Sequence, residues 1–279
     1  MGIISVFNGS FSDLLADQWS DVITADIFDE KDFVKPGIGK KRTKNKAWTN
    51  NGSFTGVISK DSIIYDPENT AAIVYNQSAI ENIIYQPGGY VFTEGDGTIF
   101  APNESGSSLF GQFKERFKYA GTPANERRVS FINLREVRGI KFGTRGPLTY
   151  HDKFYDTDME IYAYGTFSVM ITDPVNFVKK FLPANMRSYN ANQERVRDTL
   201  IPELLQSVCN AINSMSEEYR ISQLPSQNIK MAQIIETDGY NAGSWEERFG
   251  FKIVKIAIEN IEFSEESREL VNMFSEKKL

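Results

Sequence analysis

Cysteine and histidine are almost absent from this chain of 279 residues, which contains one of each, Cys209 and His151. A single thiol cannot form an internal disulfide, so the fold does not depend on an oxidising compartment. A zinc site requires several Cys or His ligands at short spacing, and a catalytic triad requires an imidazole beside a nucleophile. We therefore expect a non-enzymatic protein with no catalytic residue, no metal site and no cofactor.

Long apolar runs and an excess of positive charge are also missing. No window approaches the roughly eighteen apolar residues that a membrane-spanning helix needs, and no secretory signal pattern opens the chain. The net charge is −6, whereas general nucleic-acid binding requires a basic surface. We therefore expect a cytoplasmic protein, soluble or peripheral at the inner face of the plasma membrane, that binds no nucleic acid.

An amphipathic segment occupies residues 1–25. Its apolar side chains recur at intervals of three and four residues, which places them on one face of a helix. They are Ile4, Phe7, Phe11, Leu14, Leu15, Trp19 and Val22. The polar side carries aspartates, whereas helices that lie on membranes usually carry lysines there. Two interpretations stay open: the apolar face packs on protein, or it inserts into lipid.

A basic run lies within residues 35–59, a polar stretch that we expect to be loop-like. Its cationic residues are Lys40, Lys41, Arg42, Lys44 and Lys46. Such a run is commonly the solvated tip of a hairpin. The alternative is a docking patch for an acidic partner or for lipid headgroups.

Short β-type segments fill the middle of the chain in two groups. The first group comprises residues 62–65, 71–75, 80–85 and 90–93, and turn-forming residues separate its members. It predicts a small antiparallel subdomain over residues 60–120. The second group comprises residues 129–134, 139–142, 148–150 and 160–172. Together with a last strand at 249–263, it predicts a mixed sheet with flanking helices over residues 125–263.

Helical signals follow the longest strand. Asp173 and Pro174 stop that strand and are typical of a helix N-cap and first helical position. An amphipathic stripe predicts a helix over 192–219, with a kink or a break at Pro202. A further helix is expected over 227–236. Ser264 and the acidic residues after it predict a C-terminal helix that begins within 264–279.

Three features remain as catalytic or metal-binding alternatives. Asp156, Asp158 and Glu160 alternate, so on a strand they project from one face and could hold a hard cation such as calcium. The favoured interpretation is a solvated acidic edge, which also prevents unwanted strand pairing. His151 is interpreted as a turn histidine, and Cys209 as a buried, inert thiol.

Several ordered motifs resemble those of one known family. They are Phe-Ile-Asn at 131–133, Lys-Phe-Gly-Thr at 141–144, Tyr-Gly-Thr-Phe-Ser-Val at 164–169, Asp-Pro at 173–174, Ala-Ile-Val-Tyr-Asn at 72–76, Pro-Gly-Gly-Tyr at 87–90 and Gly-Phe-Lys-Ile-Val at 250–254. Together they resemble the SPFH superfamily (stomatin, prohibitin and flotillin, also called Band 7). The closest likeness is to its soluble bacterial branch, the virion-core-protein-like SPFH proteins.

The resemblance implies an α+β SPFH-like domain over residues 26–263. It also implies self-assembly into homo-oligomers and a scaffolding role at the cytoplasmic membrane face, in bacteria as part of a membrane-stress response. The expected partners are a membrane-anchored protein or a protein of the phage-shock-protein-A type. The alternative function is a peripheral lipid-binding module that acts through the N-terminal amphipathic segment and the basic run.

Overall fold

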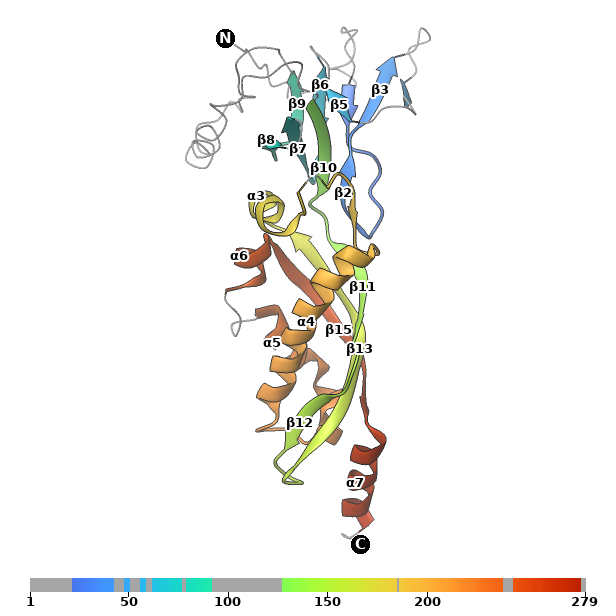
Figure 1. The fold of residues 1–279 in the computed structure, drawn as a ribbon, viewed down its shortest axis with the longest axis vertical. Coiled ribbons are helices and arrows are strands. Elements are labelled where there is room, and N and C mark those ends of the chain that lie inside the picture. Colours follow the sequence, from blue (N-terminus) through green and yellow to red (C-terminus); the bar gives the residue numbers. More distant parts are fainter. Residues whose placement is uncertain are drawn as a thin grey trace. The chain divides into compact units, whose positions relative to one another are not determined.

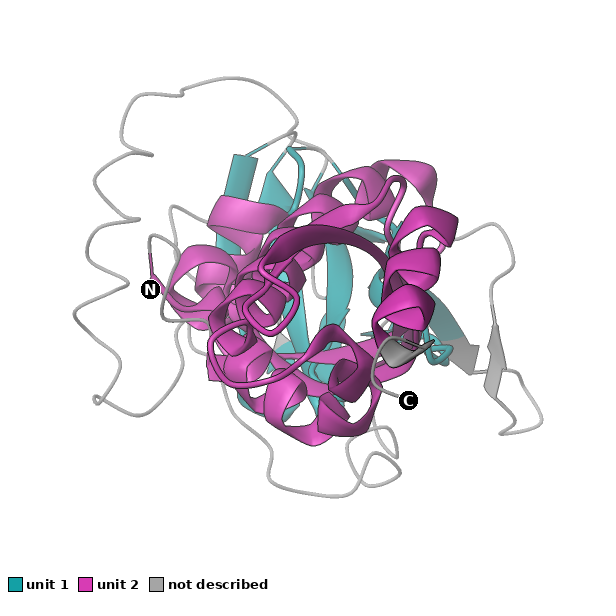
Figure 2. Cartoon of the chain, turned by 90° about the horizontal axis from the view of Figure 1, so that it is seen from below, with its two compact units in different colours: residues 1–135, 182–189 teal, residues 136–181, 190–279 magenta. Residues whose placement is uncertain are grey.

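The computed structural model describes residues 22–42, 48–50, 56–58, 62–76, 79–91, 127–184, 186–237 and 243–276. The chain forms two compact units, each with its own sheets (Figure 2). The first unit comprises Met1–Arg135 and Leu182–Tyr189, and the second comprises Glu136–Phe181 and Asn190–Leu279. The chain therefore returns to the first unit for a short stretch before it completes the second.

The first unit contains a five-stranded sheet with the order β4-β3-β1-β6-β9. Its strands are β1 (Val22–Thr24), β3 (Ile38–Arg42), β4 (Trp48–Asn50), β6 (Ile63–Asp66) and β9 (Gly88–Val91). β1 and β6 pair in parallel, and the other neighbours pair antiparallel. The sheet is therefore mixed.

The second sheet of this unit has the order β14-β2-β10-β7-β8, and β5 also pairs with β10. Its strands are β2 (Asp32–Pro36), β5 (Val57–Ile58), β7 (Thr70–Asn76), β8 (Ala79–Ile84), β10 (Arg127–Asn133) and β14 (Tyr189–Asn190). Both sheets contribute to one buried apolar cluster, with Ile23 and Ile64 from the first sheet and Val74 and Phe131 from the second. This shared burial is the main stabilising contribution to the unit.

The first unit corrects three expectations from the sequence. The four expected strands between residues 62 and 93 exist, but β6 and β9 lie in one sheet while β7 and β8 lie in the other. Residues 35–59, expected as loop, contain strands instead. β10 was assigned to the second group, yet it forms a seven-residue antiparallel ladder with β7. The reason is that apolar periodicity identifies a strand but not its partner.

The second unit is built on a four-stranded antiparallel sheet, where a mixed sheet was expected. Its strands are β11 (Val137–Gly143), β12 (Leu148–Asp152), β13 (Thr157–Ile171) and β15 (Phe251–Phe263). β11 and β12 pair with β13, and β15 also runs beside β13 (Figure 1). Gly165 permits this close approach, because a Cβ there would lie 2.0 Å from the Ala257 carbonyl oxygen.

Helices cover one face of this sheet. α4 (Glu194–Met215) and α5 (Asn228–Thr237) lie against the side from which alternate residues of β13, such as Ile161 and Phe167, are buried (Figure 1). The amphipathic stripe of α4, including Val196 and Leu204, is buried as its spacing predicts. α4 is assigned as one continuous helix through Pro202, so the expected break does not occur.

Capping residues set the ends of the shorter helices. The Asp173 carboxylate accepts a hydrogen bond from the Asn176 N–H at 2.9 Å, which confirms it as the N-cap of α3 (Pro174–Asn176). A π-helical turn, η2 (Phe177–Phe181), continues it. The Ser264 hydroxyl accepts from the Ser267 N–H at 3.3 Å and confirms the start of the C-terminal helix α7 (Glu265–Glu276). The other short elements are the 3₁₀ helix η3 (Ile221–Gln227) and α6 (Trp245–Phe249).

Candidate interaction surfaces

One buried carboxylate fastens the hairpin that joins β12 to β13. Asp152 is fully buried, and its Oδ1 accepts hydrogen bonds from the N–H groups of Phe154 at 2.9 Å and Tyr155 at 3.4 Å. Its Oδ2 accepts from the N–H of Ile221, the first residue of η3, at 2.6 Å. Hydrogen bonds to a charged group contribute about 1.5–3 kcal/mol each. The hairpin and η3 are therefore held in one fixed geometry.

An aromatic surface is built on this fixed hairpin. The Phe154 ring lies 3.4 Å from the Arg220 guanidinium carbon and packs edge-on against Tyr155, with centroids 4.9 Å apart. Tyr155 in turn packs against Phe274 of α7, with centroids 5.1 Å apart. Phe154 and Phe274 are each 43% exposed, and Met273 beside them in sequence is 51% exposed. We call Phe154, Tyr155, Met273 and Phe274 the hairpin–helix surface.

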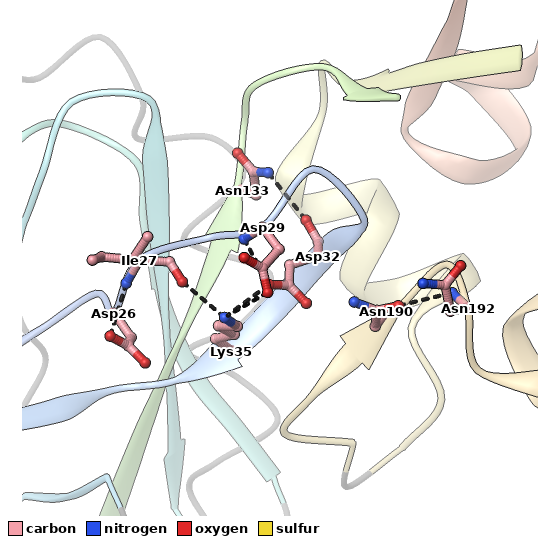
Figure 3. Close-up of polar contacts among 8 residues, drawn as sticks. All are labelled: Asp26, Ile27, Asp29, Asp32, Lys35, Asn133, Asn190 and Asn192. Atoms are coloured by element: carbon pink, nitrogen blue, oxygen red, sulfur yellow. Dashed lines mark hydrogen bonds and ion pairs between the residues drawn. The ribbon is translucent and has the colours of Figure 1, made fainter. Parts of the chain in front are cut away.

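A charged loop in the first unit presents a single exposed isoleucine (Figure 3). Lys35 Nζ lies 2.8 Å from the Ile27 carbonyl oxygen and 2.8 Å from Asp32 Oδ2, and Asp32 Oδ2 also accepts the Asp29 N–H at 2.8 Å. The Asp32 carbonyl accepts from the Asn133 amide at 3.0 Å, which ties the loop to β10. Ile27 is 83% exposed on this braced loop.

The charges around Lys35 change its proton affinity. Partial burial acts to lower the pKa of Lys35, but the hydrogen bond and charge of Asp32, together with the charges of Asp29 and Asp26, outweigh burial. The pKa is raised as a result, so the ammonium group stays charged near neutral pH. The charge on Lys35 that these contacts require is therefore present at neutral pH.

The residues considered for catalysis do not assemble into a site. His151, predicted to lie in a turn, lies on β12 instead. Its Nδ1 is 2.8 Å from Asp158 Oδ1 across the β12–β13 ladder, and both side chains are exposed. Cys209 is half-buried on α4, less buried than expected, and the Asn213 amide one helical turn away contacts its sulfur at 3.9 Å. Within the described ranges, no group of three or more His, Cys, Asp or Glu side chains is placed to hold a metal ion.

Most residues predicted for membrane or partner contact lie outside the described residues. These are Ile4, Phe7, Phe11, Leu14, Leu15, Trp19, Lys44 and Lys46. Lys40, Lys41 and Arg42 lie on β3, where they pair with β4 in antiparallel register and so form one arm of a hairpin. The basic run therefore begins on a strand, and its role in docking stays a prediction.

Sequence reasoning missed the hairpin–helix surface and the Ile27 loop. Phe154 and Tyr155 follow a strand in a polar turn, and adjacent aromatic residues in such a turn are the one local signal that marks them. Phe274 gives no such signal, because any amphipathic helix carries an apolar stripe. Only the fold brings Phe274 and Tyr155 together.

Comparison with known families agrees with this fold. The model of the SPFH domain–Band 7 family matches residues 67–278, most of the chain. The chain therefore belongs to the SPFH domain–Band 7 family, and its α+β fold with a C-terminal helix is consistent with an SPFH domain. No curated protein matches it significantly.

Family membership carries a general function. The SPFH domain–Band 7 family is one of membrane-associated scaffolds that are generally non-enzymatic. Of the helices in the part of the chain that the structure describes, none has the length and apolar character needed to cross a bilayer.

Proposed function

We propose that this chain is a non-enzymatic SPFH-domain scaffold that self-assembles and recruits protein partners at the cytoplasmic face of a membrane. The hairpin–helix surface carries the proposal. Phe154 and Phe274 are exposed to solvent, yet the hydrogen bonds of Asp152 to the hairpin and the ring contacts with Tyr155 hold them in place. Rigid exposed aromatic and methionine side chains are typical of protein–protein contact sites.

The energetics favour a partner on this surface. Full burial of a side chain such as Phe or Met stabilises a protein by about 1.5–3 kcal/mol. Phe154, Met273 and Phe274 are partly exposed, so a partner that covers them would gain part of this free energy on binding. The side-chain entropy of Phe154 and Phe274 is already reduced by their contacts with the Tyr155 ring, which lowers the cost of ordering them in a complex. A second protein surface can therefore bind here with little reorganisation.

The partners are inferred from the resemblance to the virion-core-protein-like branch rather than from the surface. A scaffold at a membrane needs a membrane-linked partner, and we infer a membrane-anchored protein or a protein of the phage-shock-protein-A type. We further infer a bacterial, cytoplasmic setting and a role in membrane stress, in line with the virion-core-protein-like branch. The homo-oligomer is the form in which the chain would present several binding surfaces at once.

The experiment compares the mass of the full-length chain with that of two variants by light scattering over a range of concentrations. We expect the wild type to form an assembly, and the Phe154→Ser/Phe274→Ser variant to weaken it. Ile229→Ser is the matched control, because Ile229 is also highly exposed in the second unit but belongs to α5. A wild type that stays monomeric at high concentration contradicts the scaffold proposal.

A second candidate function is a peripheral lipid-binding module that acts through the N-terminal amphipathic segment and the basic run. The observation that favours it is the β3–β4 pairing, which places Lys40, Lys41 and Arg42 on a hairpin arm rather than in an irregular loop. Flotation with anionic vesicles tests it with two variants, charge reversal of the basic run and deletion of residues 1–21, which stops short of Val22, the first residue of β1. Unchanged flotation of both variants would exclude this function.

A further inference from the structure

The sheet of the second unit has an outer face opposite the one that α4 and α5 cover. Side chains that alternate with the buried residues of β13 project from it, and among them Tyr162 is 36% and Tyr164 is 41% exposed. Across the ladder, Tyr162 pairs with Glu262 and Tyr164 pairs with Asn260 on β15. An antiparallel sheet tolerates such a solvated face, so exposure alone indicates no partner.

Charges divide this outer face into two ends. Exposed Lys252 and Lys255 on β15 lie opposite Met170 and Ser168, near the C-terminal end of β13. Lys141 on β11 is opposite Thr166 at the same end. The other end carries exposed acidic groups, Glu160 on β13 and Glu262 on β15. Glu136 lies at the same end as these lysines, because its carboxylate accepts a hydrogen bond from the Ser168 hydroxyl at 2.5 Å, and it pairs with Arg138 at 2.8 Å. The lysines and Arg138 outnumber this carboxylate, so one end of the outer face has a net positive charge and the other end has a net negative charge.

The two ends are too far apart to neutralise each other. Glu160 is eight positions along β13 from Ser168, the partner of Lys255, which corresponds to about 26 Å at a rise of roughly 3.3 Å per residue. The Debye length is about 8 Å at physiological ionic strength. Within one chain the attraction between the ends is therefore largely screened, and the net charge of each end acts on an approaching molecule separately.

The middle of the outer face is polar-aromatic and internally ordered. The Asn260 amide donates to the Tyr164 hydroxyl at 3.1 Å and to Glu262 Oε1 at 3.0 Å, and the Tyr164 hydroxyl lies 3.3 Å from the same Glu262 oxygen. Tyr164 is also the midpoint of the segment between Glu160 and Ser168 in sequence. Glu160 at the acidic end and Ser168 at the basic end therefore lie at equal distances along β13 from Tyr164.

We propose that two copies of this chain pair through their outer faces in an antiparallel, two-fold symmetric arrangement. The acidic end of each copy then lies on the basic end of the other, and the tyrosines meet near the symmetry axis. A two-fold interface uses the same patch on both subunits and must be self-complementary. A patch with opposite charges at equal distances from its centre meets that requirement, whereas a lipid surface or a partner of one charge would engage only half of it. The proposal rests on the proposed scaffold function, because it specifies one contact of the self-assembly.

Charge reversal tests the pairing in a way that a merely destabilising substitution cannot imitate. The variant Lys252→Glu/Lys255→Glu makes both ends acidic, and the variant Glu160→Lys/Glu262→Lys makes both ends basic. Each variant alone places like charges together at both contacts of the dimer. A mixture of the two variants restores opposite charges at every contact, and so does a chain that carries all four substitutions. Arg195→Glu/Arg197→Glu is the matched control for the first variant, since it lowers the net charge by the same amount on exposed positions of α4.

The dissociation constant of the pairing is measured by sedimentation equilibrium at about 50 mM salt, where screening is weak. We expect each single-end variant to raise it about ten-fold or more, which corresponds to roughly 1.4 kcal/mol. The equimolar mixture and the four-fold variant should return to within about three-fold of the wild type, and the control should not change it.

Each outcome separates this proposal from the scaffold function. If the wild type assembles and the single-end variants assemble equally well, the outer-face pairing is wrong while the scaffold function stands. If the variants weaken assembly but the mixture fails to recover it, two-fold complementarity is wrong. If the wild type is monomeric throughout, the scaffold function itself fails. Circular dichroism of every variant establishes that a loss of pairing does not come from unfolding.

Discussion

Replacing Asp66 by asparagine tests whether a buried carboxylate weakens the first unit at neutral pH. Asp66 ends β6 and is fully buried. Its Oδ1 accepts a hydrogen bond from the Thr70 hydroxyl at 2.7 Å, while Oδ2 has no hydrogen-bond partner among the residues that the structure describes. Burial raises the pKa of Asp66 from its ordinary value near 3.8 to about 7, and the Thr70 hydrogen bond only partly opposes this.

The magnitude and the sign follow from linkage between protonation and folding. Each pKa unit corresponds to about 1.4 kcal/mol, so ionising Asp66 in the folded protein costs about 4 kcal/mol more than in the unfolded chain. The folded protein binds the proton more tightly. The contribution of this group to the free energy of unfolding is therefore fully favourable below about pH 4, falls as the pH rises, and is lost above about pH 7.

Asp66→Asn removes the charge and keeps an oxygen that can accept from Thr70. The amide N–H groups of the asparagine would be buried without a hydrogen-bond acceptor, and this destabilises the folded variant by about 1–2 kcal/mol. We therefore expect the variant to be more stable than the wild type by about 2 kcal/mol at pH 8, and equal or less stable at pH 5. The decline in stability between those pH values should disappear.

Hydrogen–deuterium exchange of peptides from β6 and β7, in a urea series at several pH values, measures the stability of the first unit without interference from the second. Glu68→Gln is the control, because Glu68 is exposed in the same turn and should leave the decline intact. The reasoning is refuted if wild-type protection is constant from pH 5 to pH 8, or if Asp66→Asn declines as steeply as the wild type.

Two further substitutions test the second unit. Asp152→Ala removes the acceptor of the hairpin N–H groups and of the Ile221 N–H. We therefore expect the free energy of unfolding measured in urea to fall by about 3–5 kcal/mol, and the near-ultraviolet dichroism of the aromatic residues to weaken. Asp152→Asn should recover part of it. Gly165→Ala places a Cβ against the Ala257 carbonyl and should cost about 2–3 kcal/mol in the same assay, whereas Gly146→Ala, with nothing within 4 Å, should be close to neutral. An unchanged midpoint for Gly165→Ala would mean that β15 can move away from Gly165 without a measurable loss of stability.

The sequence predicted the elements whose signals are local. The alternation along β13, the Asp173 cap and the stripe of α4 each depend on residues within a few positions of one another, and all three are confirmed. The resemblance to the SPFH superfamily is also confirmed, because it rests on the order of such local motifs.

The sequence could not predict what depends on long-range pairing. β10 looks like any other apolar strand, and only its ladder with β7 assigns it to the first unit. The hairpin–helix surface needs Tyr155 and Phe274 to meet, although they belong to separate parts of the chain. Exposed aromatic residues are indistinguishable from core residues until the fold is known. This is why the surface that supports the proposed function was absent from the sequence prediction.

The return of Leu182–Tyr189 to the first unit has a practical consequence for dissecting the protein. Tyr189 is buried and packs against Phe33, with ring centroids 5.9 Å apart, so this short stretch belongs to the core of the first unit. A fragment that stops at Arg135 lacks it, and a fragment that starts at Glu136 carries it without its sheet. No single cut in the gene separates the two units intact. Any study of one unit alone therefore requires a grafted chain rather than a truncated one.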